Sequence, residues 1–387
     1  MADVRIEGIC DSRFARIKAA FAENFETRNE YGAAVAVTID GKPVVDLWSG
    51  HADKARTQPW NRDTIVNIFS ATKGLLAIAA HRLVDQGKLD LDSPVARYWP
   101  EFAQAGKEQI PVRQLLNHRA GLPALRAKVP DEACYDWNAM TTALAAEEPW
   151  WAPGTKHGYH AITIGFLVGE VIRRVTGKSV GRYFHDEIAG PLGLDCHIGL
   201  DERDDERCGQ MIQSPAPPKD QVNIFKYAQD HPESVTAKAF FNPPAAMKLG
   251  MVNSRAWRGA EVPAANGHTN ARALARLYGA LARGGEVDGI RLLEPGAIAR
   301  CSSEEADGID EVLMIPTRFS TGFMLTQPHN PMGPNRRPFG HPGAGGSLGF
   351  ADPDAKVGFG YVMNKMGPYI LIDPRGRALI DALYASL

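Results

Sequence analysis

Phe69-Ser70-Ala71-Thr72-Lys73 contains the only Ser-x-x-Lys tetrad in this 387-residue chain. It lies where an apolar, strand-like run (65–69) meets an apolar, helix-like run (74–84). In the first turn of a helix, a lysine three residues after a serine lies on the same face, so its amine can reach the hydroxyl. The positive end of the helix dipole also favours negative charge that develops on the serine oxygen.

This pair of residues suits nucleophilic catalysis. A serine hydroxyl is a weak nucleophile until a neighbouring base removes its proton. A lysine can be that base if burial and nearby cations lower its pKa. Short tetrads also arise by chance, and most helix lysines are solvated. The interpretation of Ser70 and Lys73 as a catalytic pair therefore depends on the rest of the chain.

Composition excludes several classes of protein. The length fits one large domain or two closely joined ones, and a hydrophobic content of 44% is typical of a globular protein with a sizeable core. The net charge is −2 with no charged block, so we expect neither nucleic acid nor a membrane surface as a partner. No apolar run is long enough to span a bilayer.

The compartment is inferred from the N-terminus and the cysteines. The first 21 residues carry scattered charges and lack the apolar core of a secretory signal. Five well-separated cysteines form no Cys-x-x-Cys, and the 11 histidines show no metal-ligand spacing. We therefore expect a cytoplasmic protein with no metal, no cofactor and no disulfide framework.

Strand and helix patterns are segregated along the chain. A helix is expected at 12–27, followed by strands at 32–39 and 42–50 that Asp40-Gly41 joins as a hairpin. Ser70 opens a helix that ends at Gly87, and Asp92-Ser93-Pro94 starts a short helix with Pro94 as its first residue. Longer helices are expected at 163–176 and 270–283. Strands return at the C-terminal end, and Asp373-Pro374 starts a final helix. The expected C-terminal strands are 320–326, 337–341, 347–351 and 356–363.

These patterns predict a mixed α/β (α+β) fold. An antiparallel sheet formed from both chain ends is flanked by helices, and a large, mainly helical region is inserted into it. We expect one catalytic unit over 1–387, with a sheet subdomain (1–68 plus 310–387) and a mainly helical subdomain (69–309). Residues 202–263 are rich in proline and polar residues and show little periodicity, which predicts long ordered loops.

Three further segments have the character of a site. They are LLNHRAGLP (115–123), WAPGTKHGYHA (151–161) and FGHPGAGGS (339–347). Taken singly, His118 in the first is more often structural, and Tyr159 in the second is more often a packing residue. Four glycines weaken a strand unless something approaches its backbone closely, such as a substrate acyl group. A β-bulge is the alternative explanation for that glycine cluster.

In this order, the tetrad and the three segments resemble the serine β-lactamase and penicillin-binding-protein superfamily, and most closely its esterase branch, the family VIII carboxylesterases. The resemblance covers most of the chain, and the order of four motifs is more specific than any one of them. It implies a β-lactamase/DD-peptidase-like fold in which Ser70 forms an acyl-enzyme, Lys73 helps to deprotonate it, and Tyr159 shuttles the proton and later activates water. It also implies an oxyanion hole made by the backbone N–H groups of Ser70 and Ala344. Whether Lys73 or Tyr159 is the resting base stays open.

Two departures from the superfamily bear on the substrate. Its lactamases and peptidases carry Lys-Thr-Gly where this chain has His341-Pro342-Gly343. Proline offers neither a hydroxyl nor an N–H to a substrate carboxylate, and histidine is a weaker permanent cation than lysine. The asparagine of the Tyr-x-Asn motif is replaced by Ala161. Both changes weaken recognition of anionic, amide-containing substrates and are compatible with a neutral ester.

The sequence therefore predicts a serine carboxylesterase for small or short-acyl esters. The alternatives are a β-lactamase, D-peptidase or amidase, an acyltransferase that uses the same acyl-enzyme, and a non-enzymatic binding module. The natural substrate and the oligomeric state stay open. The residues expected to bind substrate are His341, Gly343, Trp151, His160 and Trp257. Further pocket walls are expected from Trp150, Phe225, Tyr227, Phe240 and Phe241.

Gly345-Gly346-Ser347-Leu348-Gly349 matches a second hydrolase motif, the Gly-x-Ser-x-Gly elbow. The α/β-hydrolases that carry this elbow order their triad as serine, acid, histidine. No histidine follows Ser347 in the chain. We therefore do not expect Ser347 to be the nucleophile.

Overall fold

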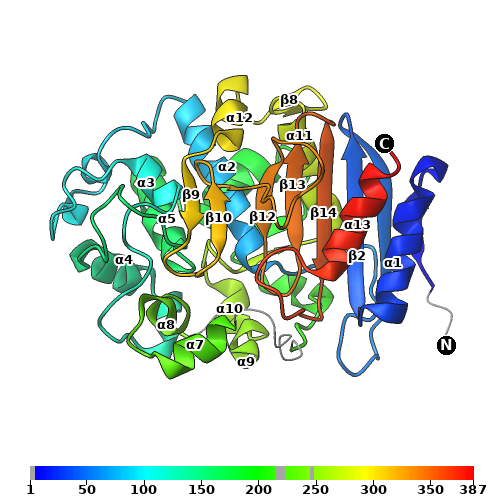
Figure 1. Ribbon diagram of the computed structural model, residues 1–387, viewed down its shortest axis with the longest axis horizontal. Helices are drawn as coiled ribbons and strands as arrows, with labels where there is room; N and C mark the ends of the chain where they lie inside the picture. Colours follow the sequence, from blue (N-terminus) through cyan, green and yellow to red (C-terminus); the bar gives the residue numbers. More distant parts are fainter. Residues whose placement is uncertain (1–4, 214–222, 245–247) are drawn as a thin grey trace.

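An antiparallel sheet built from both chain ends dominates the computed structural model, which describes residues 5–213, 223–244 and 248–387 (Figure 1). Within these residues the sheet has nine strands, and strands from the two chain ends pair at its centre. This confirms the expected fold class. The strand order is β1 (Glu7–Cys10), β3 (Lys42–Gly50), β2 (Gly32–Ile39), β14 (Val357–Met363), β13 (Leu348–Asp352), β12 (Phe339–Pro342), β11 (Met324–Leu325), β10 (Pro316–Phe319) and β9 (Ala306–Ile309).

Helices cover both faces of the sheet. Helices α1 (Ala15–Thr27) and α13 (Pro374–Tyr384) pack against each other in front of it in Figure 1. On the other face, α11 (Ala271–Ala282) packs against β14, β2 and β13. The strands of the sheet centre are buried along their whole length because both faces are covered, so β14 is a continuous apolar and glycine run rather than an alternating one.

The inserted region lies beside one half of the sheet. Its helices are α2 (Thr72–Asp85), α3 (Val112–Leu116), α4 (Trp137–Ala146), α5 (Thr163–Thr176), α6 (Val180–Phe184), α7 (Ile224–Asp230), α8 (Val235–Phe241), α9 (Leu249–Val252), α10 (Arg255–Gly259) and α12 (Pro295–Ser302). Two small sheets accompany them. They consist of β4 (Val66–Asn67), β6 (Gly267–Thr269) and β5 (Cys196–Ile198), and of β7 (Glu286–Val287) with β8 (Ile290–Arg291).

Several sequence predictions agree with these bounds because turn and cap chemistry determines them. Strands β2 and β3 coincide with the expected ranges, and Asp40 and Gly41 between them both have positive φ, as a tight hairpin turn requires. Helix α13 begins where expected, because the Asp373 carboxylate accepts hydrogen bonds from the N–H groups of Arg375 and Gly376.

Other predictions of secondary structure are wrong. Of the strand expected at 320–326, only Met324–Leu325 is extended, because the Ser320 N–H bonds to the Phe323 carbonyl in a turn that separates β10 from β11. Strand β9 was not expected, and it places residues of the sheet before the predicted boundary at 310. The short helix expected to start at Asp92-Ser93-Pro94, with Pro94 as its first residue, is a 3-10 turn at Val95–Arg97 with Pro94 as its N-cap. The division into two subdomains stays a prediction.

The prediction of loops over 202–263 is wrong for much of that range. It contains a 3-10 turn at Glu202–Arg207 and the short helices α7 to α10. Side-chain caps from Asn223, Ser234 and Ser254 start three of these helices. Residues 214–222 and 245–247 of the predicted loops lie outside the described residues. Helices this short show no clear apolar period.

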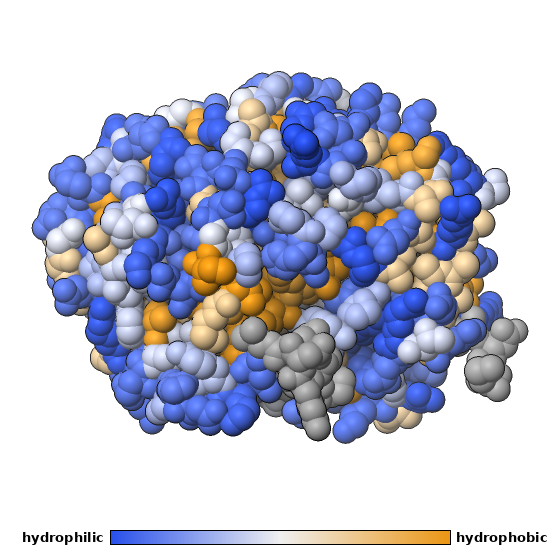
Figure 2. Space-filling view, viewed as in Figure 1, coloured by the Kyte–Doolittle hydropathy of each residue, from blue (hydrophilic) through white to orange (hydrophobic). Residues whose placement is uncertain are grey.

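An apolar hollow opens on the face seen in Figures 1 and 2. Most of this face is hydrophilic, and the hollow lies between the lower ends of β10 and β12 and helix α10. Apolar residues that are only partly buried against the core include Phe240, Met251, Ile315, Ala344, Met366 and Ile370.

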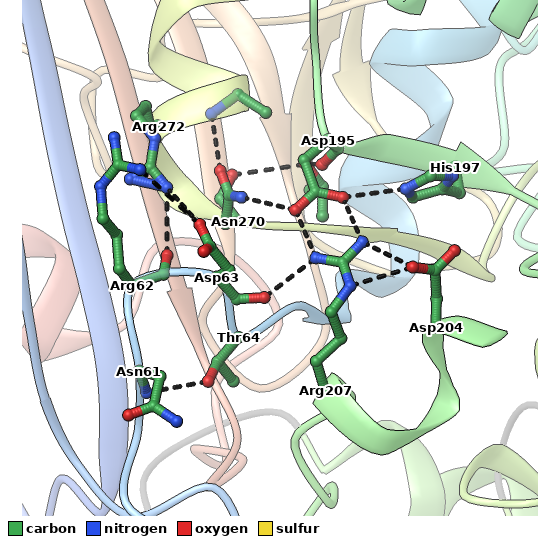
Figure 3. A network of polar contacts seen from close by, with 12 residues as sticks. Asn61, Arg62, Asp63, Thr64, Asp195, His197, Asp204, Arg207, Asn270 and Arg272 are labelled. Carbon is green, nitrogen blue, oxygen red and sulfur yellow. Dashed lines mark hydrogen bonds and ion pairs between the residues drawn. The ribbon is translucent and has the colours of Figure 1, made fainter.

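A polar network fastens the inserted region to the sheet (Figure 3). Arg207 forms ion pairs with Asp195 and Asp204, and Asn270, which caps α11, also bonds to Asp195. Burial alone would raise the pKa of Asp195, but hydrogen bonds from Arg207 and His197 hold it well below its usual range. Next to this network, Arg272 pairs with Asp46 of β3. The network therefore joins segments far apart in the sequence.

Candidate active site

Ser70 lies in a 3-10 turn, Phe69–Ala71, directly before α2. Phe69 has a φ of 45°, a left-handed conformation that is costly for a bulky residue. The Thr72 hydroxyl stabilises the turn by donating to the Phe69 carbonyl (2.5 Å) and accepting from the Gly267 N–H (2.8 Å). The sharp strand-to-helix turn therefore presents Ser70 at the N-terminal end of α2.

Lys73 is buried, with 2% of its surface exposed, and its amine is held at the serine. Nζ lies 3.0 Å from Ser70 Oγ and donates to the carbonyl oxygens of Ala161 (2.8 Å) and Ala264 (3.0 Å). Burial lowers the pKa of Lys73 well below its usual range. A neutral amine has two N–H groups for the two carbonyls and one lone pair that can face the serine hydroxyl.

Tyr159 completes the group with a buried ring beside Lys73. Lys73 Nζ lies 4.7 Å from the centre of the ring, and Phe319 stacks on it at 6.2 Å. Burial raises the pKa of Tyr159, and a hydrogen bond with Ser70 acts in the opposite direction. The structure therefore brings Ser70, Lys73 and Tyr159 together, and it leaves Tyr159 as a neutral phenol at rest.

The end of β12 packs directly against the serine turn. A Cβ atom on Gly343 would lie 2.2 Å from the Ile68 carbonyl oxygen, so the two backbones are in close contact. Ser347 Oγ donates to the same oxygen (2.8 Å), which gives Ser347 a structural role. Among the described residues, neither the Ser70 N–H nor the Ala344 N–H has an intramolecular acceptor. Both are therefore available to an anionic oxygen.

A buried ion cluster supports the other side of this strand end. Arg375 donates to the Gly345 carbonyl (2.7 Å) and forms ion pairs with Asp373 and Glu30. Tyr361 in β14 donates to Glu30. Burial raises the pKa of Glu30, and the positive charge of Arg375 opposes that rise. The cluster ties both chain ends to the segment that carries the Ala344 N–H.

His341 lies on β12 beside Tyr159, with the two ring centres 5.9 Å apart. Its Nδ1 bonds to the Pro342 carbonyl (2.7 Å), so that nitrogen carries the proton. Its Nε2 is buried and has no hydrogen-bond partner among the described residues. Burial and the neighbouring Lys73 lower the pKa of His341 to about 3. The ring is therefore neutral at physiological pH and offers an acceptor, where the lactamases of the superfamily offer a cation.

Three predicted binding residues have other contacts. His160 uses both ring nitrogens, with Nδ1 on the Gly158 carbonyl and Nε2 accepting from the Leu122 N–H. Trp257 is fully buried and donates to Asn67 Oδ1 (2.9 Å). Trp151 packs against Gly158, behind the tyrosine segment. His160 and Trp257 use their polar side-chain atoms within the protein, whereas the buried Trp151 Nε1 has no hydrogen-bond partner among the described residues. That the three residues contact substrate stays a prediction.

The predicted pocket walls are divided. Phe240 is partly buried against the core, whereas Phe225 is 50% exposed and packs on Phe241 (ring centres 6.1 Å apart). Tyr227 packs on His231, and Trp150 donates to the Ala124 carbonyl. That these residues form pocket walls stays a prediction.

The described residues contain no cluster of three or more potential metal ligands. In the same part of the chain, none of the helices combines the length and apolar character needed to cross a membrane.

Sequence reasoning missed the groups that hold the catalytic candidates in place. The acceptors of Lys73 are backbone carbonyls, which leave no side-chain signature. The carboxylates and the guanidinium of the Arg375 cluster are single charged residues in unremarkable contexts. Asp310, whose Oδ1 accepts from the Tyr159 N–H (3.0 Å), stands in an acidic stretch that resembles a solvated surface.

The fold and the Ser70–Lys73–Tyr159 group define a protein of the serine β-lactamase and penicillin-binding-protein superfamily. The family model described as Beta-lactamase matches residues 17–382. This chain therefore belongs to the beta-lactamase family.

Relatives of known name agree with this assignment. The protein named Esterase/beta-lactamase LipL, from Mycobacterium tuberculosis, is 38% identical over 96% of this chain and 86% of its own length. A crystal structure of a family VIII carboxylesterase matches with 42% identity and a TM-score of 0.91, over 99% of this chain and 100% of that one. A penicillin-binding protein homolog from Caulobacter crescentus matches with 41% identity, the same TM-score and the same coverage. Together they support serine hydrolase activity.

Proposed function

We propose that the protein is a carboxylesterase of the family VIII type (EC 3.1.1) that cleaves small, neutral esters through an acyl-enzyme on Ser70. The observation that carries the proposal is the environment of Lys73. Its Nζ contacts Ser70 Oγ and two carbonyls, and within the described part of the chain no carboxylate is hydrogen bonded to it. Burial without a counter-ion favours the neutral amine, which is the form that can accept the serine proton.

Acylation then uses three groups in order. Lys73 takes the Ser70 proton while Oγ bonds to the ester carbonyl carbon, whose oxygen becomes an oxyanion. The N–H groups of Ser70 and Ala344 bind that oxyanion. When the ester C–O bond breaks, Tyr159 gives its proton to the departing alkoxide, and the phenolate recovers a proton from the Lys73 ammonium. The alcohol leaves, and the acyl group stays on Ser70.

Deacylation reverses the proton path. A water molecule gives a proton to the Tyr159–Lys73 pair and attacks the acyl carbonyl. The bond to Ser70 Oγ then breaks, the proton returns to Ser70, and the acid leaves. If an alcohol takes the place of water, the product is a new ester, so acyl transfer needs no additional catalytic group.

The surroundings of the site support a neutral ester. His341 is neutral and offers an acceptor, Pro342 offers no donor, and Ala161 cannot hold an amide. An anionic substrate would therefore meet no permanent cation from this motif. The apolar hollow on this face suits a short acyl chain or an apolar alcohol.

A β-lactamase is the second candidate. Serine β-lactamases also form an acyl-enzyme at a Ser-x-x-Lys serine, and the name of the Mycobacterium tuberculosis relative includes both activities. The neutral His341 argues against efficient turnover of an anionic lactam.

The test compares p-nitrophenyl butyrate with nitrocefin for wild type, Ser70→Ala and the control Ser303→Ala. Ser303 is an exposed serine whose hydroxyl bonds to a carbonyl one helical turn earlier. We expect ester hydrolysis that Ser303→Ala retains and Ser70→Ala loses, with little nitrocefin turnover. Ester turnover by Ser70→Ala would refute the mechanism. Strong, Ser70-dependent nitrocefin turnover would favour the second candidate.

A further inference from the structure

Asp310 is a buried carboxylate that binds the backbone of the tyrosine segment. It directly follows β9, and its side chain is fully buried. Oδ1 accepts hydrogen bonds from three N–H groups, those of Tyr159 (3.0 Å), Val312 (2.8 Å) and Leu313 (2.8 Å). This single oxygen therefore joins the segment that contains Tyr159 to the turn after β9, about 150 residues later in the chain.

The second oxygen of this carboxylate continues the network inward. The Thr317 hydroxyl on β10 donates to Asp310 Oδ2 (3.2 Å). Because that hydroxyl gives its one proton to Asp310, it accepts the bond from His157 Nε2 (2.9 Å). His157 precedes Tyr159 by two residues, so the network binds the tyrosine segment both directly and through Thr317.

The same carboxylate also determines the turn that follows it. The Val312 carbonyl in this turn accepts from Thr236 in α8 (2.8 Å), and the turn leads to Ile315, which packs partly buried against the core. Asp310 therefore connects Tyr159 on one side with the turn that contacts α8 on the other. Burial raises the pKa of Asp310, and its three bonds from N–H groups act against that rise.

We infer that Asp310 is a positioning residue that holds the Tyr159 hydroxyl where it can protonate the departing alcohol. The inference rests on the proposed function, in which Tyr159 donates that proton. It predicts a dependence on the leaving group. An alkoxide is a strong base and needs the proton as the C–O bond breaks, whereas p-nitrophenolate is stable without it. A displaced Tyr159 should therefore slow alkyl esters far more than p-nitrophenyl esters.

The test measures kcat/KM, which reports acylation, for ethyl butyrate and p-nitrophenyl butyrate. Asp310→Ala removes the acceptor, and we expect a loss of about 100-fold for the ethyl ester, the cost of misplacing a reacting group by about 1 Å. We expect the aryl ester to lose less than a tenth as much. Asp310→Glu, which keeps the charge but displaces it, should show the same selective loss. Asp310→Asn should recover much of the ethyl ester rate, because its Oδ1 can still accept from the three N–H groups.

Glu311→Gln is the matched control. It removes the carboxylate of the next residue, which pairs with the exposed Lys156 and has no bond to Tyr159. We expect wild-type selectivity from it. In a Tyr159→Phe background, Asp310→Asn and Asp310→Glu should cause no further selective loss, because the group they position is gone.

The outcomes separate the two levels of the proposal. If Tyr159→Phe itself does not discriminate between the two esters, the proposed role of Tyr159 fails. If Tyr159→Phe discriminates but folded Asp310→Ala and Asp310→Glu slow both esters equally, the inference about Asp310 is overturned. Circular dichroism and the melting temperature establish that each variant is folded. If Asp310→Ala does not fold, the Asp310→Glu ratio decides the question.

Discussion

Replacement of Gly343 by alanine tests whether the contact between β12 and the serine turn sets the oxyanion hole. The added Cβ would lie 2.2 Å from both the Ile68 carbonyl oxygen and Ser347 Oγ. Real Cβ contacts begin near 3.0 Å, so the atoms must separate by 3.0 minus 2.2, or about 0.8 Å. The Ser347 side chain can rotate away, but Ile68 is backbone and immediately precedes the turn with Ser70.

The expected loss of activity follows from this displacement. Gly343 precedes Ala344, so the two N–H groups of the hole move apart when β12 is pushed from the turn. A misplacement of about 1 Å costs about 100-fold in rate. Loss of one donor of an oxyanion hole costs about 3 kcal/mol, which is also about 100-fold. We therefore expect Gly343→Ala to lower kcat by 100- to 1000-fold, and overpacking to destabilise the fold by about 1–3 kcal/mol.

The measurement is kcat for p-nitrophenyl butyrate at saturating substrate, at a temperature where the variant is folded by circular dichroism. The control is Gly296→Ala in α12, where the nearest atom to the new Cβ is Arg300 Nη1 at 3.7 Å, an ordinary contact. It should retain wild-type kcat and gain a little stability. A folded Gly343→Ala enzyme with kcat within threefold of wild type would refute the reasoning, because the hole would then tolerate separation of its two sides.

Three other perturbations test the electrostatics of the site and the fold. Because Lys73 must be neutral to accept the serine proton, kcat/KM should rise with pH through its depressed pKa, and a pH–rate profile without that acidic limb would contradict its role as base. His341→Lys replaces a neutral ring by a cation, so the ratio of nitrocefin to p-nitrophenyl butyrate turnover should rise. The added charge should also lower the pKa of Lys73 and move the acidic limb of the pH–rate profile to lower pH. An unchanged turnover ratio would show that this position does not select substrates by charge. Arg207→Met leaves Asp195 and Asp204 without their cation. Because these ion pairs are only partly buried, urea denaturation should show that the free energy of unfolding falls by about 2 kcal/mol. An unchanged urea midpoint would mean that the network adds no net stability.

The parts of the fold that sequence could predict are those determined by local chemistry. Asp40-Gly41 gave the bounds of two strands, and Asp373-Pro374 gave the start of α13. Helices α7 to α10 have four to seven residues, too few for an apolar period to emerge. The interrupted strand at 320–326 was misjudged because apolar residues lie on both sides of a turn whose hydrogen bonds are made by the backbone.

In the candidate site, too, the sequence reveals residues whose side chains carry chemistry but not the backbone groups that hold them. Ser70, Lys73 and Tyr159 could be proposed from the sequence because their side chains carry the chemistry and recur in a recognisable order, and the structure brings them together. The groups that hold these side chains in place are mostly backbone atoms. The Lys73 amine, for example, donates to the carbonyl oxygens of two alanines. Asp310 acts through N–H groups that any residue could supply. Such partners depend on where the chain passes in space, so no local pattern reveals them.

The glycines after His341 lie beside Ser70, as the sequence suggested, but the cause of their close contacts differs from the one expected. The sequence suggested that a substrate approaches their backbone, but the close approaches in the structure are made by the protein itself. Gly343 faces the Ile68 carbonyl, and a Cβ on Gly346 would lie 2.6 Å from Asp373 Oδ2. The segment with the Ala344 N–H is thus held between the serine turn and a buried ion cluster. A donor fixed from both sides needs no reorganisation when the oxyanion forms, which is the condition under which such a group accelerates acyl transfer most. The glycines therefore reflect the rigidity of the hole and say nothing about the size of the acyl group.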